Sequence, residues 1–436
     1  MKNYTENIPL SKADPEIYQA IVNELERQRN GLEMIPSESY VSPAVLRAMG
    51  SILTDKYSEG YPYKRYYGGQ TNTDVVESLA IERAKKIFNV SHANVQPYSG
   101  SPANQAVYFA LCEPGDTIMG LDLRHGGHLT HGWNVNFSAK YYKSVSYGVG
   151  SNGYIDFDQV RQIAKKEKPK LIWAGATAYP REYDYKSFAE IAKEVGAFFA
   201  ADIAHVIGLI IAGVHASPVG HADVITSTTH KTLRGPRAGI ILCNGNPSEP
   251  LKATPPITKE NIPTLIDRAI FPGLQGGPHE HIIAGIAVAL KEAQTQEFIE
   301  SNKMIIKTCK IIADKLLENG FNLISGGTDN HLILMDVTNK NIDGKEAEEA
   351  LDKIGISVNK NAVPNDPRPP YSPSGIRLGT PCMVIRGMAE EEAKIIGGCI
   401  SETLQNAKDE NIINKNKKII NELCLKFALY PGEKIE

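Results

Sequence analysis

The feature that most constrains the fold is a regular alternation of apolar, strand-like runs with helix-like runs between about residues 31 and 285. Residues 171–175 form a continuous apolar run of strand length, whereas residues 188–195 carry apolar side chains at helical spacing. Strands that alternate with helices favour a mostly parallel sheet. We therefore predict a doubly wound α/β fold for this part of the chain. Its ligands would bind outside the carboxyl ends of the strands.

The remaining residues are predicted to form an N-terminal arm and a second domain. Residues 15–30 have an amphipathic helical pattern, and we expect residues 1–30 to form an N-terminal arm or a dimer-packing helix. The large α/β domain is placed at residues 31–285 and a smaller α+β domain at residues 286–436. Helices are expected at 282–293, 303–317 and 345–354, a strand at 332–337, and a surface insertion at 245–264.

Charge and cysteine content exclude several classes of protein. The net charge is −3 and the sequence pI is about 6.4, which gives no positive field for nucleic acid or an anionic membrane. No apolar run approaches the roughly 20 residues of a membrane span, and the polar start of the chain does not match a signal or transit peptide. The six cysteines are scattered without a C-x-x-C pair. We expect a reduced, cytoplasmic protein.

Residues 227–237, Ser-Thr-Thr-His-Lys-Thr-Leu-Arg-Gly-Pro-Arg, contain the most informative lysine, Lys231. A lysine becomes a nucleophile when its pKa is lowered or when it is held beside a carbonyl. The neighbouring Arg234 and Arg237 favour the free amine, and the hydroxyl-rich turn can hold a phosphate. These properties suit an imine between Lys231 and pyridoxal phosphate. The alternative is an ordinary surface lysine in a basic loop.

An acid and a phosphate cradle precede this lysine. Residues 198–202 are an apolar run that ends in Asp202, as expected for a buried strand with an acid at its carboxyl end. A second strand is predicted at 222–226, and Asp202 would pair with the cofactor's pyridinium nitrogen unless it is a capping or core-paired aspartate. The Gly/Ser turn at 99–101 leads into a helix predicted at 103–111. There Gly100 and Ser101 would cradle a phosphate, although such turns also cap many helices.

In this order, the segments resemble those of the serine hydroxymethyltransferase (glycine hydroxymethyltransferase) family, which are pyridoxal-phosphate enzymes of fold type I. Further matches are Lys-Tyr-Ser-Glu-Gly-Tyr-Pro at 56–62, Lys-Arg-Tyr-Tyr-Gly-Gly at 64–69 and His-Gly-Gly-His-Leu-Thr-His-Gly at 125–132. Phe-Pro-Gly-Leu-Gln-Gly-Gly-Pro at 271–278 and Ser-Gly-Ile-Arg-Leu-Gly-Thr-Pro at 374–381 complete the set. The resemblance implies the fold-type-I transferase fold, with a large, mostly parallel sheet domain followed by a smaller α+β domain.

The resemblance also implies a site for the cofactor. Asp202 would face its ring nitrogen, His205 its phenolic oxygen and His230 its phosphate. Ala204 would pack below the ring, His128 would stack above it, and Arg237 would fix the lysine loop. The full predicted cofactor-binding set is Ser37, Tyr57, Gly100, Ser101, His128, Thr177, Asp202, Ala204, His205, His230, Lys231, Arg237 and Gly277.

Amino-acid and folate residues follow from the same resemblance. Arg377 would grip the substrate carboxylate through its planar guanidinium, and Glu59 would act as acid and base on the substrate hydroxyl. The substrate set is Ser37, Glu59, Tyr66, Tyr67 and Arg377, and the catalytic set is Lys231, Glu59, His128, Asp202 and Tyr67. Tetrahydrofolate would contact Leu123, Gly127, His128, Leu129 and Asn361. Tyr57, Tyr67 and Gly277 match residues that the family donates across a homodimer, and the choice between dimer and tetramer stays open.

Departures from the family's pattern keep three functional hypotheses open. Gln-Thr-Asn-Thr follows the two glycines at 68–69, Trp133-Asn134 follows the last His-Gly of the histidine segment, and Thr177 stands where serine is common. The leading hypothesis is folate-dependent interconversion of serine and glycine. The second is a β-hydroxy-amino-acid aldolase or transaldolase, or an α-methylserine hydroxymethyltransferase. The third is a non-catalytic scaffold or a nucleic-acid binder.

Histidines at positions 125, 128 and 131 raise the alternative of a metal site. Glycines at 126 and 127 place these histidines in a loop. On the view that no cysteine or acid lies nearby, we predict no metal.

Overall fold

A seven-stranded sheet forms the centre of the larger region. In this computed structural model, which describes residues 8–244 and 261–432, the strand order is β4-β10-β9-β8-β7-β5-β6. The strands are β4 His92–Asn94, β10 Gly239–Cys243, β9 Val224–Thr228, β8 Phe198–Asp202, β7 Leu171–Ala174, β5 Thr117–Leu121 and β6 Lys143–Tyr147. Neighbours pair in parallel except at β10, which is antiparallel to both β9 and β4. The predicted, mostly parallel α/β sheet is confirmed.

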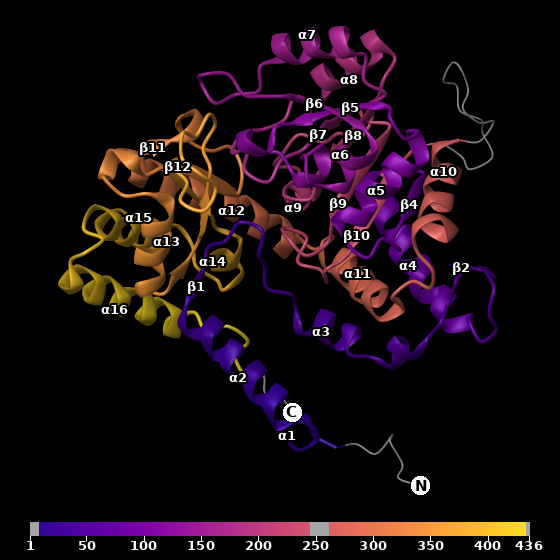
Figure 1. Ribbon diagram of the computed structural model, residues 1–436. Helices are drawn as coiled ribbons and strands as arrows, with labels where there is room; N and C mark the ends of the chain where they lie inside the picture. The colour runs from indigo at the N-terminus through magenta and orange to yellow at the C-terminus, as the bar shows by residue number, and fades with distance from the viewer. Residues whose placement is uncertain (1–7, 245–260, 433–436) are drawn as a thin grey trace.

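Both faces of this sheet are covered (Figure 1). Successive side chains of a strand point to opposite faces. In β7, Leu171 and Trp173 pack into one core cluster with α5, whereas Ile172 and Ala174 join the cluster that contains α7 and α8. The helices of this region are α3 Pro43–Met49, α4 Thr71–Phe88, α5 Gly100–Leu111, α6 Phe137–Tyr141, α7 Phe157–Glu167, α8 Tyr185–Val195, α9 Ile207–Ile211, α10 Ile262–Arg268 and α11 Glu280–Glu292.

A smaller sheet organises the C-terminal region. It has the order β11-β12-β15-β14, and all of its pairings are antiparallel. The strands are β11 Asn322–Leu323, β12 Leu332–Asp336, β15 Gly375–Gly379 and β14 Asn359–Asn361. The helices are α12 Gln296–Glu318, α13 Gly344–Lys353, α14 Pro381–Ile385, α15 Glu390–Gln405 and α16 Glu410–Lys426. The expected α+β character of this region is confirmed.

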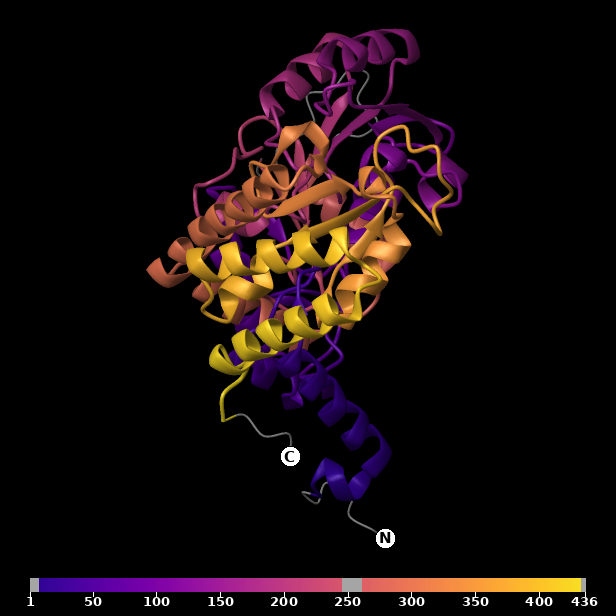
Figure 2. The ribbon, with the colours of Figure 1, turned by 90° about the vertical axis from the view of Figure 1, so that its left-hand side faces the viewer.

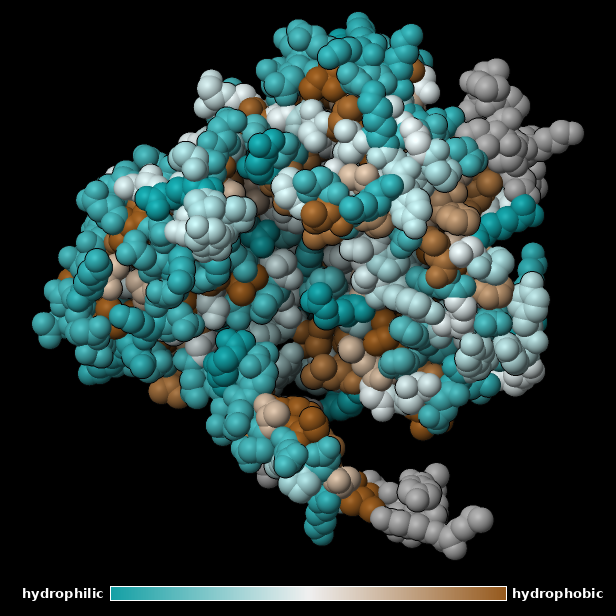
Figure 3. Space-filling view, in the orientation of Figure 1, coloured by the Kyte–Doolittle hydropathy of each residue, from teal (hydrophilic) through white to brown (hydrophobic). Residues whose placement is uncertain are grey.

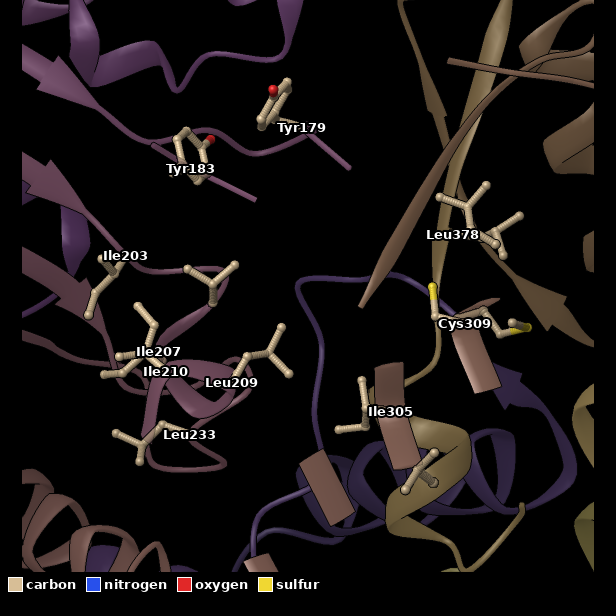
Figure 4. Close-up of a cluster of buried hydrophobic side chains, with 14 of the residues drawn as sticks. Tyr179, Tyr183, Ile203, Ile207, Leu209, Ile210, Leu233, Ile305, Cys309 and Leu378 are labelled. Carbon is tan, nitrogen blue, oxygen red and sulfur yellow. The ribbon is translucent and has the colours of Figure 1, made fainter. Parts of the chain in front are cut away.

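The two regions share one hydrophobic core. Figure 4 shows Ile207 and Leu209 of α9 on one side and Ile305 and Cys309 of α12 on the other, and all four belong to a single buried cluster. Strand β1 (Leu32–Glu33) pairs in parallel with β13 (Ile356–Ser357) of the C-terminal region. The chain therefore contacts the smaller region directly after its N-terminal helix, and the domain boundaries at 31 and 285 stay predictions.

The N-terminal arm consists of α1 (Leu10–Ala13) and α2 (Pro15–Asn30), and it projects from the body (Figures 1 and 2). The bounds of α2 are those predicted, since Asp14 caps the N–H of Ile17 and Pro15 occupies the first helical position. No residue of α2 is buried, and hydrophobic surface is visible on the projecting arm (Figure 3). The arm thus offers an uncovered helix face.

Arg386 anchors the root of this arm. Its guanidinium donates hydrogen bonds to the carbonyl oxygens of Gln28, Arg29 and Gly31 at the end of α2. It also donates to the carbonyl oxygens of Cys424 and Phe427 at the end of α16. A cation at two helix C-termini is favourable because both helix dipoles are negative there.

Three further predictions concern surface and compartment. No helix within residues 8–244 and 261–432 is long and apolar enough to cross a membrane. All six cysteines are buried thiols without a disulfide. Most of the predicted insertion at 245–264, namely residues 245–260, lies outside the described residues.

Candidate active site

Lys231 lies in a buried turn at the carboxyl end of β9. The turn is closed by hydrogen bonds from the N–H of Thr229 to the carbonyl of Ala238 and from the N–H of Gly235 to the carbonyl of Thr229. Lys231 is 8% exposed. Burial lowers the pKa of its amine to about 8; the charge of Asp202 opposes this shift, and Arg377 and Arg237 add to it. About one tenth of the amine is therefore uncharged at pH 7, far more than for an ordinary lysine.

Asp202 ends β8, the strand next to β9. Its Oδ2 accepts hydrogen bonds from Nδ2 of Asn104 at 2.9 Å and from Nε2 of His131 at 3.2 Å, and its Oδ1 accepts from the N–H of Ala204 at 3.0 Å. Burial alone would raise the pKa of Asp202. The hydrogen bond and charge of His131, the charge of His128 and the amide of Asn104 outweigh burial and lower it. The carboxylate is therefore held as an anion.

The first turn of α5 faces the carboxyl end of β9. A Cβ on Gly100 would lie 2.7 Å from Cγ2 of Thr228, so only glycine allows this approach. Ser99 precedes the helix and makes no capping hydrogen bond. The N–H groups of Gly100 and Ser101 therefore remain at a helix N-terminus, which attracts anions such as phosphate.

The ring of His128 is held by its neighbours as a neutral imidazole. Its Nδ1 lies 2.6 Å from Oγ1 of Thr130 and 3.3 Å from the backbone N of Thr130, whose N–H donates to it. Burial lowers the pKa of His128 to about 4; the charges of His131 and Lys231 add to this shift, while Asp202 opposes it. Because Nδ1 accepts, the hydrogen of the neutral ring is on Nε2.

The remaining predicted residues of the lysine turn and the β8 end are also buried or close to Lys231. Nε2 of His205 and Nδ1 of His230 are buried and have no hydrogen-bond partner within the described residues. Burial lowers the pKa of His230 to about 3, with the charges of Arg237 and Lys231 adding to it. Arg237 itself is exposed.

Arg377, on β15 of the smaller region, also lies close to Lys231. It donates from Nη1 to the carbonyl of Thr177 and from Nη2 to Oδ1 of Asn359 at 3.0 Å. Thr177 in turn donates its N–H to the carbonyl of Gly126, next to the His128 loop. Nε of Arg377 is buried and has no hydrogen-bond partner among residues 8–244 and 261–432, and burial lowers the pKa of Arg377 to about 10. In the described residues, no acid forms an ion pair with this guanidinium.

The residues above form one group, the lysine group, defined as Gly100, Ser101, His128, Thr177, Asp202, Ala204, His205, His230, Lys231, Arg237 and Arg377. A second set of predicted residues, the tyrosine group, lies elsewhere in the chain and comprises Tyr57, Glu59, Tyr66, Tyr67 and Gly277. Within it, the rings of Tyr57 and Tyr67 make an edge contact at 5.3 Å. A Cβ on Gly277 would lie 3.4 Å from the ring of Tyr57. No hydrogen bond or ring contact of the described residues joins the two groups.

The structure gives less support to the predicted position of Ser37 and to the predicted folate residues. Ser37 follows Pro36, and a Cβ on Gly379 of β15 would lie 2.9 Å from Cβ of Pro36, so Ser37 lies near the end of the strand that carries Arg377. Of the folate residues, Leu123 and His128 line a cavity of about 630 Å³ that Trp133 and His131 also line. Gly127, Leu129 and Asn361 lie outside its lining.

The prediction that no acid lies near the histidines at 125–131 is wrong. The fold brings Asp202 beside His128 and His131, and the possible ligand atoms of all three lie within 4.8 Å of one another. These atoms already serve the hydrogen bonds described above. The absence of a resident metal stays a prediction.

Three polar residues of the site were missed by the sequence reasoning: Asn104, His131 and His331. Asn104 is 1% exposed on the apolar face of α5, between Ala103 and Ala106, and that position is a signal that could have been used. His331 is fully buried and contacts His205, from a segment 126 residues away in the sequence. No local pattern indicates that contact.

A comparison with protein families identifies the family of this chain. A family model described as serine hydroxymethyltransferase matches residues 10–400. The match covers most of the chain, and the chain belongs to this family. Enzymes of the family use pyridoxal phosphate and take tetrahydrofolate as co-substrate.

The residues present fit this cofactor. An aldehyde requires a nearby uncharged amine, a pyridinium nitrogen requires an anion, and a phosphate requires N–H donors. Lys231 supplies the amine, Asp202 the anion and the start of α5 the N–H donors, all at the carboxyl ends of β8 and β9. The unpartnered buried nitrogens of His205 and His230 are further groups that a polar ligand would satisfy.

Proposed function

We propose that this family member catalyses the reversible transfer of the serine hydroxymethyl group to tetrahydrofolate, which gives glycine and 5,10-methylenetetrahydrofolate. Its general activity, that of a pyridoxal-phosphate-dependent transferase of the serine hydroxymethyltransferase type, follows from the family. The specific amino acid and acceptor are our proposal.

The observation that carries the proposal is the environment of Arg377. A guanidinium that is buried without an acid costs free energy, and an incoming carboxylate would offset that cost. The planar fork of arginine binds a carboxylate through two parallel hydrogen bonds. Arg377 lies close enough to Lys231 for its charge to lower the pKa of the lysine, so an α-amino acid held by Arg377 would have its α-carbon near the lysine.

The roles of the other residues follow from their protonation states. The bound cofactor supplies an electron sink for the bond that breaks at the α-carbon. Asp202, kept anionic, would hold a proton on the ring nitrogen beside it. Lys231, partly uncharged at neutral pH, would accept or return a proton at its Nζ. Neutral His128 would cover the ring face and exclude water. Arg377 would fix the orientation of the bond to be broken.

Glu59 would act from a second subunit in a homodimer. No hydrogen bond or ring contact of the described residues joins the tyrosine group to the lysine group, and its tyrosines are exposed: Tyr57 is 59% exposed and Tyr67 is 50% exposed. Aromatic side chains are enriched at protein interfaces. A partner subunit that contributes Tyr57, Glu59 and Tyr67 would complete a site around Lys231.

Serine cleavage measured with and without tetrahydrofolate tests the proposed reaction. We expect rapid conversion of serine to glycine only when tetrahydrofolate is present, with methylenetetrahydrofolate formed in equal amount. Cleavage that does not respond to folate would instead support the aldolase or transaldolase alternative. Turnover of α-methylserine in preference to serine would support the α-methylserine hydroxymethyltransferase alternative. The Lys231→Ala variant should lose the visible absorbance of the bound cofactor; if it kept that absorbance, the lysine assignment would be wrong.

Mixing two inactive variants tests the shared site. Lys231→Ala chains still carry Glu59, and Glu59→Gln chains still carry Lys231. If each site uses both subunits, random mixing restores one intact site in each hybrid dimer, or about a quarter of wild-type activity. If each site is built from one chain, refolded mixtures stay inactive.

A further inference from the structure

Two buried histidines contact each other beside the site. Nδ1 of His205 lies 3.2 Å from Nε2 of His331, and the ring centroids are 5.4 Å apart. His331 is 0% exposed and His205 is 5% exposed. Burial lowers the pKa of His331 to about 3, and it lowers the pKa of His205 well below its ordinary value. Both rings are therefore neutral at physiological pH.

A contact between two neutral imidazoles admits only two arrangements, because each ring carries one N–H. In the first, His331 donates from Nε2, and the hydrogen of His205 is then on its outer nitrogen, Nε2. In the second, His205 donates from Nδ1, and its Nε2 is a bare lone pair. The outer nitrogens, Nε2 of His205 and Nδ1 of His331, are both buried and without a partner in the described residues. The state of His331 therefore determines what His205 presents to the site.

The position of His331 is fixed by the contact between the two regions. The preceding residues dock on the larger region: Nδ2 of Asn330 donates to the carbonyl of Tyr179 at 3.1 Å, and the N–H of Asp329 donates to the carbonyl of Pro180 at 2.8 Å. Arg181 forms an ion pair with Asp329 at 2.9 Å. A side chain held from both regions keeps its orientation, which a positioning role requires.

We propose that His331 is a positioning residue that donates its Nε2–H to Nδ1 of His205. This inference rests on the proposed function and on the prediction, made from the family resemblance, that His205 faces the phenolic oxygen of the cofactor. That oxygen accepts hydrogen bonds, so only the first arrangement gives it a donor. His331 thereby keeps His205 in the tautomer with hydrogen on Nε2, without itself touching cofactor or substrate.

Two substitutions separate hydrogen bonding from packing. His331→Gln retains an N–H donor that can reach His205, whereas His331→Met fills a similar volume without a donor. The matched control is His215→Gln: His215 is also buried, but it makes no hydrogen bond to His205 or His331, and its Nδ1 donates to the carbonyl of Ala216.

The first readout is the dissociation constant of pyridoxal phosphate, measured with the full chain in the absence of serine and folate. We expect about tenfold weaker binding in His331→Met, from the lost hydrogen bond, and near-wild-type binding in His331→Gln and His215→Gln. Wild-type affinity in His331→Met would overturn the proposal. Equal losses in His331→Met and His331→Gln would also overturn it, because the effect would then be one of packing.

The second readout is the nitrogen NMR spectrum of histidine-labelled protein, with and without cofactor. Protonated and bare imidazole nitrogens have distinct shifts, and in the wild-type complex His205 should show hydrogen on Nε2 and His331 a bare Nδ1. Hydrogen on Nδ1 of His205 in that complex would overturn the proposal. A chain that binds the cofactor but does not transfer the hydroxymethyl group would refute the proposed function and leave this test intact.

Discussion

Two buried arginines of this molecule have opposite surroundings. Arg65 is the last residue of β3 (Lys64–Arg65). Its side chain is 3% exposed and contacts Asp74 at 2.9 Å, Glu77 at 2.6 Å and Glu280 at 3.7 Å. Arg377 has no acidic partner within the described residues. Arg65 is therefore surrounded by acidic side chains, whereas Arg377 is a largely buried cation without an acidic partner in the described residues. Buried arginines are thus not equivalent, and the count of neighbouring acids separates a structural anchor from a candidate binding group.

Arg65 anchors the loop that carries the tyrosine group. Its Nη1 donates to the carbonyl oxygens of Ser58 and Gly60, on either side of Glu59. The hydroxyl of Ser58 donates to Oε1 of Glu280 at 2.6 Å. The charged network therefore fixes the backbone from which Glu59 and Tyr57 extend. By contrast, Thr177 and Asn359 hold Arg377 of the smaller region through neutral oxygen atoms, so its positive charge stays available to an anionic ligand.

The largest effect is expected for Arg65→Met. Removal of the guanidinium leaves three acids near one another in a buried place, and breaking such a network by removing one partner costs about 3–5 kcal/mol. Denaturant unfolding should show this loss of stability. A loss below about 1 kcal/mol would mean that the acids are neutralised without Arg65, and the comparison would fail.

Arg377→Met should have the opposite signature. We expect serine affinity to fall about 100-fold or more, which corresponds to roughly 3 kcal/mol, because the carboxylate loses a charged, bidentate partner. Cofactor binding and unfolding free energy should stay close to wild type. Calorimetric titration and denaturation of the same preparation measure both. Unchanged serine affinity would refute the assignment of Arg377 to the carboxylate.

Asn359→Asp would make the surroundings of Arg377 resemble those of Arg65. The change places a carboxylate 3.0 Å from Nη2 without altering side-chain size. The new acid would compete with the substrate, so serine affinity should fall about tenfold while stability is kept or increased. Tighter serine binding in this variant would contradict the view that Arg377 waits for an anion. Asn359→Ala is the control for loss of the hydrogen bond alone.

The smallest effect concerns pH. Burial raises the pKa of Glu77 to about 7 from an ordinary value of 4.5; Arg65 opposes this shift and the charge of Glu280 adds to it. The folded state therefore keeps a proton that the unfolded state has lost. This contribution to stability is complete below pH 4.5 and is lost as pH rises through about 7. Between about pH 6 and 8 we expect a loss of about 1 kcal/mol.

Glu77→Gln should abolish that part of the pH dependence, since the amide stays neutral throughout. Denaturation at several pH values should give a flatter profile for the variant than for wild type. Identical profiles would show that Glu77 does not hold the proton, and Glu280→Gln would then be the variant to measure.

Elements set by local chemistry were predicted well from the sequence. The observed bounds of β8 are the predicted ones because a short apolar run ends at a charged residue. The observed bounds of α2 are also the predicted ones because Asp14 and Pro15 mark the start of the helix. Strand β9 begins at Val224, two residues later than predicted. There the carboxylate of Asp223 accepts the N–H of Phe199 at 2.8 Å, in place of a ladder hydrogen bond. A side chain that substitutes for backbone pairing cannot be recognised from hydrophobicity.

Contacts between distant segments could not be predicted from spacing. Asn104 and Asp202 are 98 residues apart, and His131 and Asp202 are 71 residues apart. Motif order indicated Lys231, Asp202 and Arg377 because those residue types are chemically diagnostic. The residues that set their protonation, such as Asn104 and His131, are ordinary side chains whose importance comes from where the sheet places them.

The clamp made by Arg386 has a consequence for biosynthesis. Its acceptors at the end of α2, Gln28 and Arg29, lie 358 and 357 residues before it in the sequence, so this anchor cannot form until Arg386 has left the ribosome. Until Arg386 emerges, the end of α2 lacks this attachment to its own body. A second copy made nearby would meet it first in that open state.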